Sequence, residues 1–145
     1  MNEKSTLCKR ILAFMIVCMT SLLMHGCGGN EDYSKIDVDL TEMSSTMVYS
    51  EVFDMVNKPD DYQGKTVKMK GNIYMVMDEK KAKIKCYCII ADATKCCQQG
   101  MEFELREEPD KYPKADSEVT VVGVADKVKS KDGEYCVIKK AEFVE

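Results

Sequence analysis

Residues 65–78 read Lys-Thr-Val-Lys-Met-Lys-Gly-Asn-Ile-Tyr-Met-Val-Met-Asp, and this stretch decides the fold. Apolar or small residues alternate with polar ones, which is the period of a half-buried β-strand. The polar face carries Lys68, Lys70, Asn72 and Tyr74, whereas the other face carries Val67, Met69, Gly71, Ile73, Met75 and Met77. The stretch therefore predicts a long strand with one side on a core.

The same alternation returns in four later segments, residues 82–91, 101–105, 118–128 and 134–144. Apolar residues at helical spacing in 48–56 predict one helix before the strands, ended by Lys58-Pro59. Gly71 and Gly123 fall within strands, where a small barrel bends sharply. One N-terminal helix and five strands predict an all-β domain over residues 47–145, a five-stranded Greek-key barrel of the OB-fold type.

Three phrases also resemble known proteins. Residues 59–71 (Pro-Asp-Asp-Tyr-Gln-Gly-Lys-Thr-Val-Lys-Met-Lys-Gly) and 114–123 (Lys-Ala-Asp-Ser-Glu-Val-Thr-Val-Val-Gly) resemble strands of bacterial OB-fold families related to anticodon-binding domains. Residues 90–103 (Ile-Ala-Asp-Ala-Thr-Lys-Cys-Cys-Gln-Gln-Gly-Met-Glu-Phe) resemble a signature of OB-like lipoproteins of anaerobic Firmicutes. The resemblance spans residues 48–145. It implies the fold and leaves the ligand open, because function does not follow from fold.

The first 26 residues have the pattern of a secretory signal: a basic start, an apolar run over 11–24 and a small residue before Cys27. The run is shorter than the ~20 residues of a membrane-spanning helix. Residues 23–27, Leu-Met-His-Gly-Cys, resemble a lipobox, although Met24 and His25 depart from it. The resemblance implies lipidation of Cys27, with acyl chains such as palmitate, and an extracytoplasmic protein anchored in the cell membrane. A plain signal peptide and an uncleaved anchor are the alternatives.

Residues 27–46 are polar and acidic, which predicts a flexible tether between the lipid and the domain. Within them, the alternation of Ile36, Val38 and Leu40 is a short strand-like pattern.

Charge and composition exclude several classes of function. Removal of the leader lowers Lys+Arg from 21 to 18 and Asp+Glu from 25 to 24, which gives the mature chain a net charge of −6. Such a chain is a poor partner for nucleic acid, which is bound by neutralising phosphates. The sole histidine, His25, belongs to the leader, so His-dependent triads and His-containing metal sites are excluded. We therefore expect no enzyme.

Five cysteines follow the leader and Cys27: Cys86, Cys88, Cys96, Cys97 and Cys136. Four interpretations of these cysteines remain open. Export favours disulfides; thiols could instead be small core residues; or Cys86, Cys88, Cys96 and Cys97 could bind Zn or Cu as four thiolates. A redox-active pair is a fourth and weaker interpretation.

Tyr74 and Tyr87 fall on the faces opposite the apolar rows, where an OB barrel presents its binding surface. They are candidates for stacking on a ligand, and cross-strand sheet stabilisation is the alternative. The sequence thus predicts a lipid-anchored, non-catalytic binding module without a cofactor, whose partner is a protein, a glycan or a small molecule. The alternative is a metal-binding or redox-sensing lipoprotein that uses the four-cysteine cluster.

Overall fold

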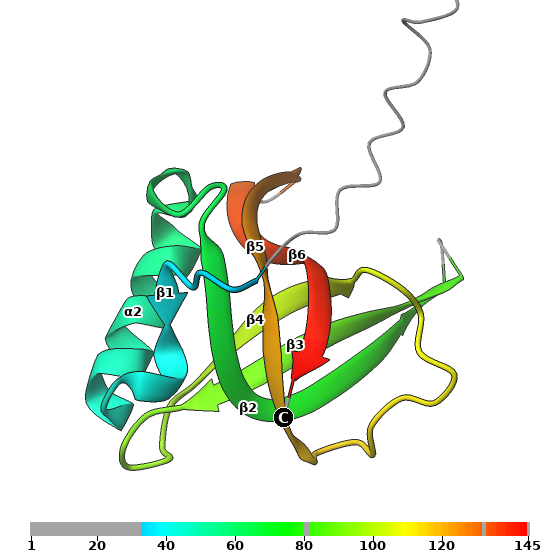
Figure 1. Cartoon of the computed structure of the whole chain (residues 1–145), viewed down its shortest axis with the longest axis horizontal. Coiled ribbons are helices and arrows are strands. Elements are labelled where there is room, and N and C mark those ends of the chain that lie inside the picture. The colour runs from blue at the N-terminus through cyan, green and yellow to red at the C-terminus, as the bar shows by residue number, and fades with distance from the viewer. Residues whose placement is uncertain (1–32, 80–81, 132, 145) are drawn as a thin grey trace, which may run out of the picture. The chain divides into compact units, whose positions relative to one another are not determined.

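The computed structural model describes residues 33–79, 82–131 and 133–144 (Figure 1). The described chain forms six β-strands, one α-helix and two short 3₁₀ helices. In chain order they are β1 (Val38–Asp39), η1 (Leu40–Glu42), α2 (Ser45–Asn57), η2 (Pro59–Asp61), β2 (Thr66–Asp78), β3 (Lys83–Ala91), β4 (Gln98–Leu105), β5 (Glu118–Ser130) and β6 (Gly133–Val144).

Five of the strands close into a barrel in the order β2-β3-β4-β6-β5, with β5 pairing back onto β2. The neighbours are antiparallel except β4 and β6, which run parallel. This mixture arises because the chain crosses from β4 to β5 before β6 returns beside β4. The arrangement confirms the predicted all-β, OB-like barrel with a single helix.

The long strand β2 belongs to both sides of the barrel. Its residues 66–72 pair with β5, and residues 72–78 pair with β3. The change of partner falls at Asn72, next to Gly71, where a Cβ atom would lie 2.5 Å from the carbonyl oxygen of Ile89 and 2.8 Å from the sulfur of Cys88. Only glycine allows this close approach, which agrees with the bend predicted there. Toward the end of β2, its residues 76–78 and residues 83–85 of β3 project from the barrel as a two-stranded ribbon (Figure 1).

The barrel interior holds the residues that the alternation predicted. Val67, Met69 and Ile73 of β2 are fully buried, as are Phe103, Val121 and Ile138 from the other strands. Met77 differs, since 59% of its surface is exposed. It lies in the projecting ribbon, where the barrel no longer covers the inner face of β2.

Helix α2 begins after Ser44, whose hydroxyl accepts a bond from the backbone N–H of Met47, and it ends before Pro59. Its buried residues are Val52 and Met55, and the helix contacts β3, β4 and β6 (Figure 1). The predicted helix is therefore confirmed. Phe53, which the spacing placed on the apolar face, is 53% exposed because it lies on the solvent side of the turn that buries Val52.

The ordered domain begins before residue 47, the boundary that the sequence predicts. β1 pairs in parallel with β2, and both Val38 and Leu40 are buried in the core. Tyr33 is held by its hydroxyl, which donates to the Lys140 carbonyl and accepts from the Arg106 guanidinium at 3.0 Å. The segment from Tyr33 to 46 is therefore part of the domain, because its alternating apolar residues bury surface that a flexible tether would leave in water. The leader and Cys27 lie outside the described residues.

Candidate functional site

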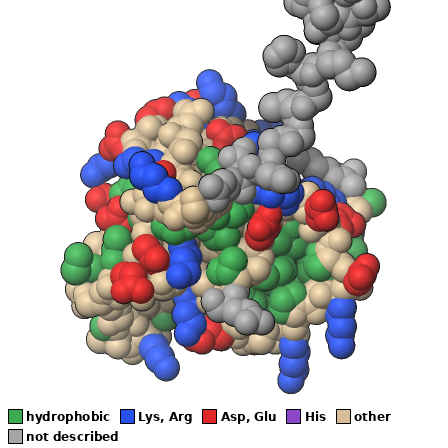
Figure 2. Space-filling view, viewed as in Figure 1, with side chains coloured by type: hydrophobic (Ala, Val, Ile, Leu, Met, Phe, Trp, Pro, Cys, Tyr) green, Lys and Arg blue, Asp and Glu red, His purple; other side chains and the backbone are tan. Residues whose placement is uncertain are grey.

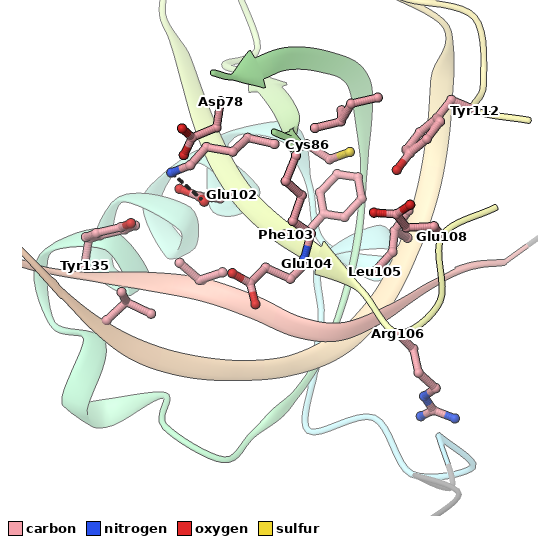
Figure 3. Close-up of a pocket in the computed structure, with 15 residues that line it drawn as sticks. Asp78, Cys86, Glu102, Phe103, Glu104, Leu105, Arg106, Glu108, Tyr112 and Tyr135 are labelled. Carbon is pink, nitrogen blue, oxygen red and sulfur yellow. Dashed lines mark ion pairs between the residues drawn. The ribbon is translucent and has the colours of Figure 1, made fainter. Parts of the chain in front are cut away.

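A cleft opens where β3 and β4 separate. The two strands pair from Cys86 opposite Phe103 to Ala91 opposite Gln98. Before Cys86, β3 continues along β2, whereas beyond Phe103, β4 runs beside β6. The diverging strands leave a cavity of about 300 Å³ between them (Figure 3), which we call the β3–β4 cleft.

The cleft has an apolar part and a polar part. Ile84, Cys86, Phe103 and Leu105 form the apolar part, and Tyr112 reaches it from the loop between β4 and β5 (Figure 3). The polar part carries Lys85, Glu102, Glu104 and Tyr135, and Figure 3 shows Tyr135 at the opposite side of the cleft from Tyr112. This combination of apolar walls with a few convergent polar groups is typical of ligand sites.

Glu102 is the centre of the polar part. Among the described residues, Glu102 is the charged residue whose side chain is buried, with 9% of its surface exposed. One carboxylate oxygen lies 3.1 Å from the Lys85 ammonium group, and the other accepts a hydrogen bond of 3.4 Å from the Tyr87 hydroxyl. A charge is costly to bury without partners, so these contacts hold Glu102 in one orientation.

Three residues near Glu102, namely Lys85, Tyr87 and Tyr135, have raised pKa values. The hydrogen bond to Glu102 is the largest cause that raises the pKa of Lys85. Burial first, and then the charge of Glu102, raise the pKa of Tyr87 and of Tyr135 above its usual value near 10. At neutral pH Lys85 is therefore a cation and the Tyr135 hydroxyl is protonated, and both can donate hydrogen bonds at the wall of the cleft.

Charges of both signs line the cleft. The acidic residues are Asp78, Glu102, Glu104 and Glu108, and the basic ones are Lys83, Lys85 and Arg106. On the face visible in Figure 2, acidic and basic side chains are likewise interspersed, with apolar side chains between them. A cleft of this kind lacks the uniform positive potential that binding of a polyanion requires.

The two tyrosines predicted as contact residues stand opposite each other on β2 and β3. Tyr87 is half-buried and supports the cleft through its bond to Glu102. Tyr74 is 52% exposed and lines a separate hollow with Ile89, Lys95 and others. Only Tyr87 thus adjoins the cleft. The sequence did not single out Glu102, Tyr135 or Tyr112, because their convergence depends on the divergence of β3 and β4.

Comparisons with protein-family models, with curated proteins and with solved structures gave no significant match to this chain. The strand order and register of the barrel therefore define the fold. Among the described residues, no helix is both long and apolar enough to cross a membrane.

The five cysteines are free thiols and lie in two environments. Cys86, Cys88 and Cys136 are buried, and burial is the first cause that raises the pKa of Cys88 to about 12 and that of Cys136 to about 11. Cys96 and Cys97 are exposed in the turn between β3 and β4. The three inner thiols are thus neutral core groups at physiological pH.

The predicted cluster of four thiolates is therefore not assembled in the structure. Among the described residues, the group whose ligand atoms all lie within 4.8 Å of one another joins Cys96 and Cys97 to Asp92, without Cys86 or Cys88. The physical reason is the strand period, which directs residues 86 and 88 into the barrel, whereas the turn directs residues 96 and 97 into solvent.

Proposed function

We propose that this protein is a lipid-anchored binding module at the extracytoplasmic face of the cell membrane, which holds a hydroxyl-rich ligand such as a glycan in the β3–β4 cleft without catalysing a reaction. The observation that carries the proposal is Glu102, a buried carboxylate that Lys85 and Tyr87 hold at the wall of a cleft. Conformationally fixed polar groups of this kind give a binding site its specificity.

The lining of the cleft supports the class of ligand. The carboxylates of Glu102 and Glu104 can accept hydrogen bonds from hydroxyl groups, and the Lys85 ammonium group can donate to them. Tyr135 offers a ring against which an apolar sugar face can pack. OB-folds bind oligosaccharides as well as oligonucleotides. Four carboxylates in the cleft disfavour the phosphates of an oligonucleotide.

The ordered N-terminal segment bears on the proposed anchor at Cys27. Tyr33 is fixed to Arg106 and Lys140 of the barrel. Six residues lead from Cys27 to Tyr33, and an extended chain advances at most ~3.6 Å per residue. A lipid on Cys27 would therefore keep Tyr33 within about 20 Å of the lipidated residue, so the module would act close to the bilayer.

The anchor is tested by labelling cells that express the full chain with an alkyne analogue of palmitate. We expect label on the wild type, which sediments with membranes, and none on Cys27→Ser. Absence of label from the wild type would refute the lipid anchor.

The cleft is tested by titrating the full chain in detergent micelles with neutral, cationic and acidic oligosaccharides. Tyrosine fluorescence reports binding, because the chain has no tryptophan. Loss of one aromatic contact costs about 1 kcal/mol, or about fivefold in affinity. We therefore expect Tyr135→Ala to weaken binding about fivefold and Glu102→Gln to weaken it further.

Tyr74→Ala is the matched control, because Tyr74 is an exposed tyrosine that lies outside the cleft. It should bind as the wild type does. Thermal unfolding of Glu102→Gln shows whether that variant remains folded. Equal affinity of Tyr135→Ala and the wild type, or binding of none of the oligosaccharides, would contradict the proposal.

A further inference from the structure

The turn between β3 and β4 is organised by the carboxylate of Asp92. One oxygen, Oδ1, accepts from the backbone N–H groups of Cys96 at 3.0 Å and Cys97 at 3.4 Å. The Asp92 N–H donates to the Cys97 carbonyl at 3.0 Å and closes the loop. Lys95 completes the turn with a positive φ of 59°. The side chains of two adjacent cysteines are thereby held on one side of a short loop, next to a carboxylate.

The second oxygen of Asp92 lies beside the thiol of Cys96. Oδ2 is 3.4 Å from the sulfur of Cys96, and that sulfur is 3.6 Å from the sulfur of Cys97. The hydroxyl of Thr94 donates to Oδ2 at 3.0 Å and lies 3.0 Å from the Cys96 sulfur. All three residues at which a metal could bind are therefore oriented before any ion arrives.

These spacings match the edges of a tetrahedral coordination sphere. With Zn–S bonds of about 2.3 Å and a Zn–O bond of about 2.1 Å, two thiolates lie about 3.8 Å apart and a thiolate lies about 3.6 Å from a carboxylate oxygen. The observed separations of 3.6 and 3.4 Å differ from these edges by about 0.2 Å. The sulfur of Cys97 also lies within 4.8 Å of the ligand oxygen of Asp92, so a movement of these side chains brings all three ligands to one ion.

We propose that Cys96, Cys97 and the Oδ2 oxygen of Asp92 bind one thiophilic divalent cation of the Zn²⁺ class. Each thiol gives up its proton as the metal–sulfur bond forms, so binding of one ion releases two protons. Both cysteines are exposed, and the fourth coordination position therefore faces solvent, where a water molecule or a ligand atom can occupy it. Cys86 and Cys88 take no part, since they lie inside the barrel.

The site is tested by titrating the reduced full chain, in detergent micelles under anaerobic conditions, with Cd²⁺ and with Zn²⁺. Cadmium–thiolate bonds give an ultraviolet charge-transfer absorption, and Zn²⁺ is followed by competition with a chromophoric chelator. We expect one ion per chain at this site, with affinity that rises with pH. Cys96→Ser and Cys97→Ser should each weaken binding at least 100-fold, and Asp92→Asn about tenfold.

Two further variants keep the result interpretable. The double variant Cys96→Ser/Cys97→Ser measures binding by the other thiols of the chain, including those of the leader, and is subtracted. Cys86→Ala should retain the ion, because its sulfur lies inside the barrel. The site is refuted if Cys96→Ser/Cys97→Ser binds as many ions as the wild type. If Asp92→Asn bound the ion as tightly as the wild type, the carboxylate would not be a ligand. If a folded Cys86→Ala lost the ion, the metal site would have to include the buried thiols.

Discussion

Cys86 and Cys88 are buried, whereas Cys96 and Cys97 are exposed to solvent. Both pairs lie within residues 86–97, yet the first pair is inside the barrel and the second is in solvent. Strand β3 sorts the first pair inward because its side chains alternate with a period of two. The turn that follows is organised by Asp92, which holds the second pair outward. Neighbouring thiols in a sequence therefore form one site only when the backbone between them brings them together. Here the backbone separates buried thiols from exposed ones.

The largest effect should come from crowding the inner pair. Gly71→Ala would place a Cβ atom 2.5 Å from the Ile89 carbonyl oxygen and 2.8 Å from the Cys88 sulfur. Because the backbone of β3 must move, we expect the free energy of unfolding to fall by about 3 kcal/mol. Urea unfolding followed by far-ultraviolet circular dichroism measures this loss.

Gly100→Ala is the matched control. The nearest atom to its added Cβ is the Cδ1 of Ile89 at 3.4 Å, in a side chain that can rotate. Stability should change by less than about 0.5 kcal/mol. Equal losses in the two variants would contradict the close packing of β2 over Cys88.

The two pairs can next be compared by one chemical change, cysteine to serine. Cys88→Ser buries a hydroxyl in place of a thiol in a fully enclosed position, and we expect a loss of about 2 kcal/mol. Cys97→Ser is exposed and should change stability by less than about 0.5 kcal/mol. Chemical denaturation of both variants without metal gives the comparison, and similar losses would show that the two cysteines share one environment.

A smaller effect should appear as the pH rises. The pKa of Cys88 is about 12 in the folded chain, against an ordinary value of 9.0, because the thiol is buried. Since the raised pKa belongs to the folded state, the unfolded chain loses its proton first and stability falls above pH 9. Between pH 8 and 10 this one thiol should cost about 1.4 kcal/mol of stability.

Cys88→Ala removes that titration, so its stability should fall less steeply than that of the wild type between pH 8 and 10. The raised pKa values of Lys85 and Lys139 act at higher pH, because both lie above 10.5. Parallel pH profiles of the wild type and Cys88→Ala would mean that Cys88 ionises in the folded chain as it does in the unfolded one.

The sequence predicted the barrel because its signals are local. The alternation in residues 65–78 and the glycine at 71 fix both the strand and its bend, and the pattern before Pro59 fixes the helix. It did not place β1 in the domain, since a strand of two residues gains stability from the neighbouring β2 and not from its own pattern.

The candidate sites were harder to predict because they depend on tertiary geometry. Glu102 lies on the outer face of β4, where alternation predicts exposure. It is nevertheless buried, and it contacts Lys85 and Tyr87 of the neighbouring strand β3. Asp92 carries no metal-binding signature of its own. Asp92 becomes a candidate ligand only when the turn brings its carboxylate close to the sulfur atoms of Cys96 and Cys97.

The separation of the two cysteine pairs is tested most directly by alkylating the native, reduced and metal-free chain with iodoacetamide and locating the modified residues by mass spectrometry. The structure predicts rapid modification of Cys96 and Cys97, with Cys88 and Cys136 modified only after a denaturant is added. Cys86, which is 3% exposed at the wall of the cleft, should react much more slowly than Cys96. Modification of Cys86 or Cys88 in the native chain as fast as that of Cys96 would contradict the separation.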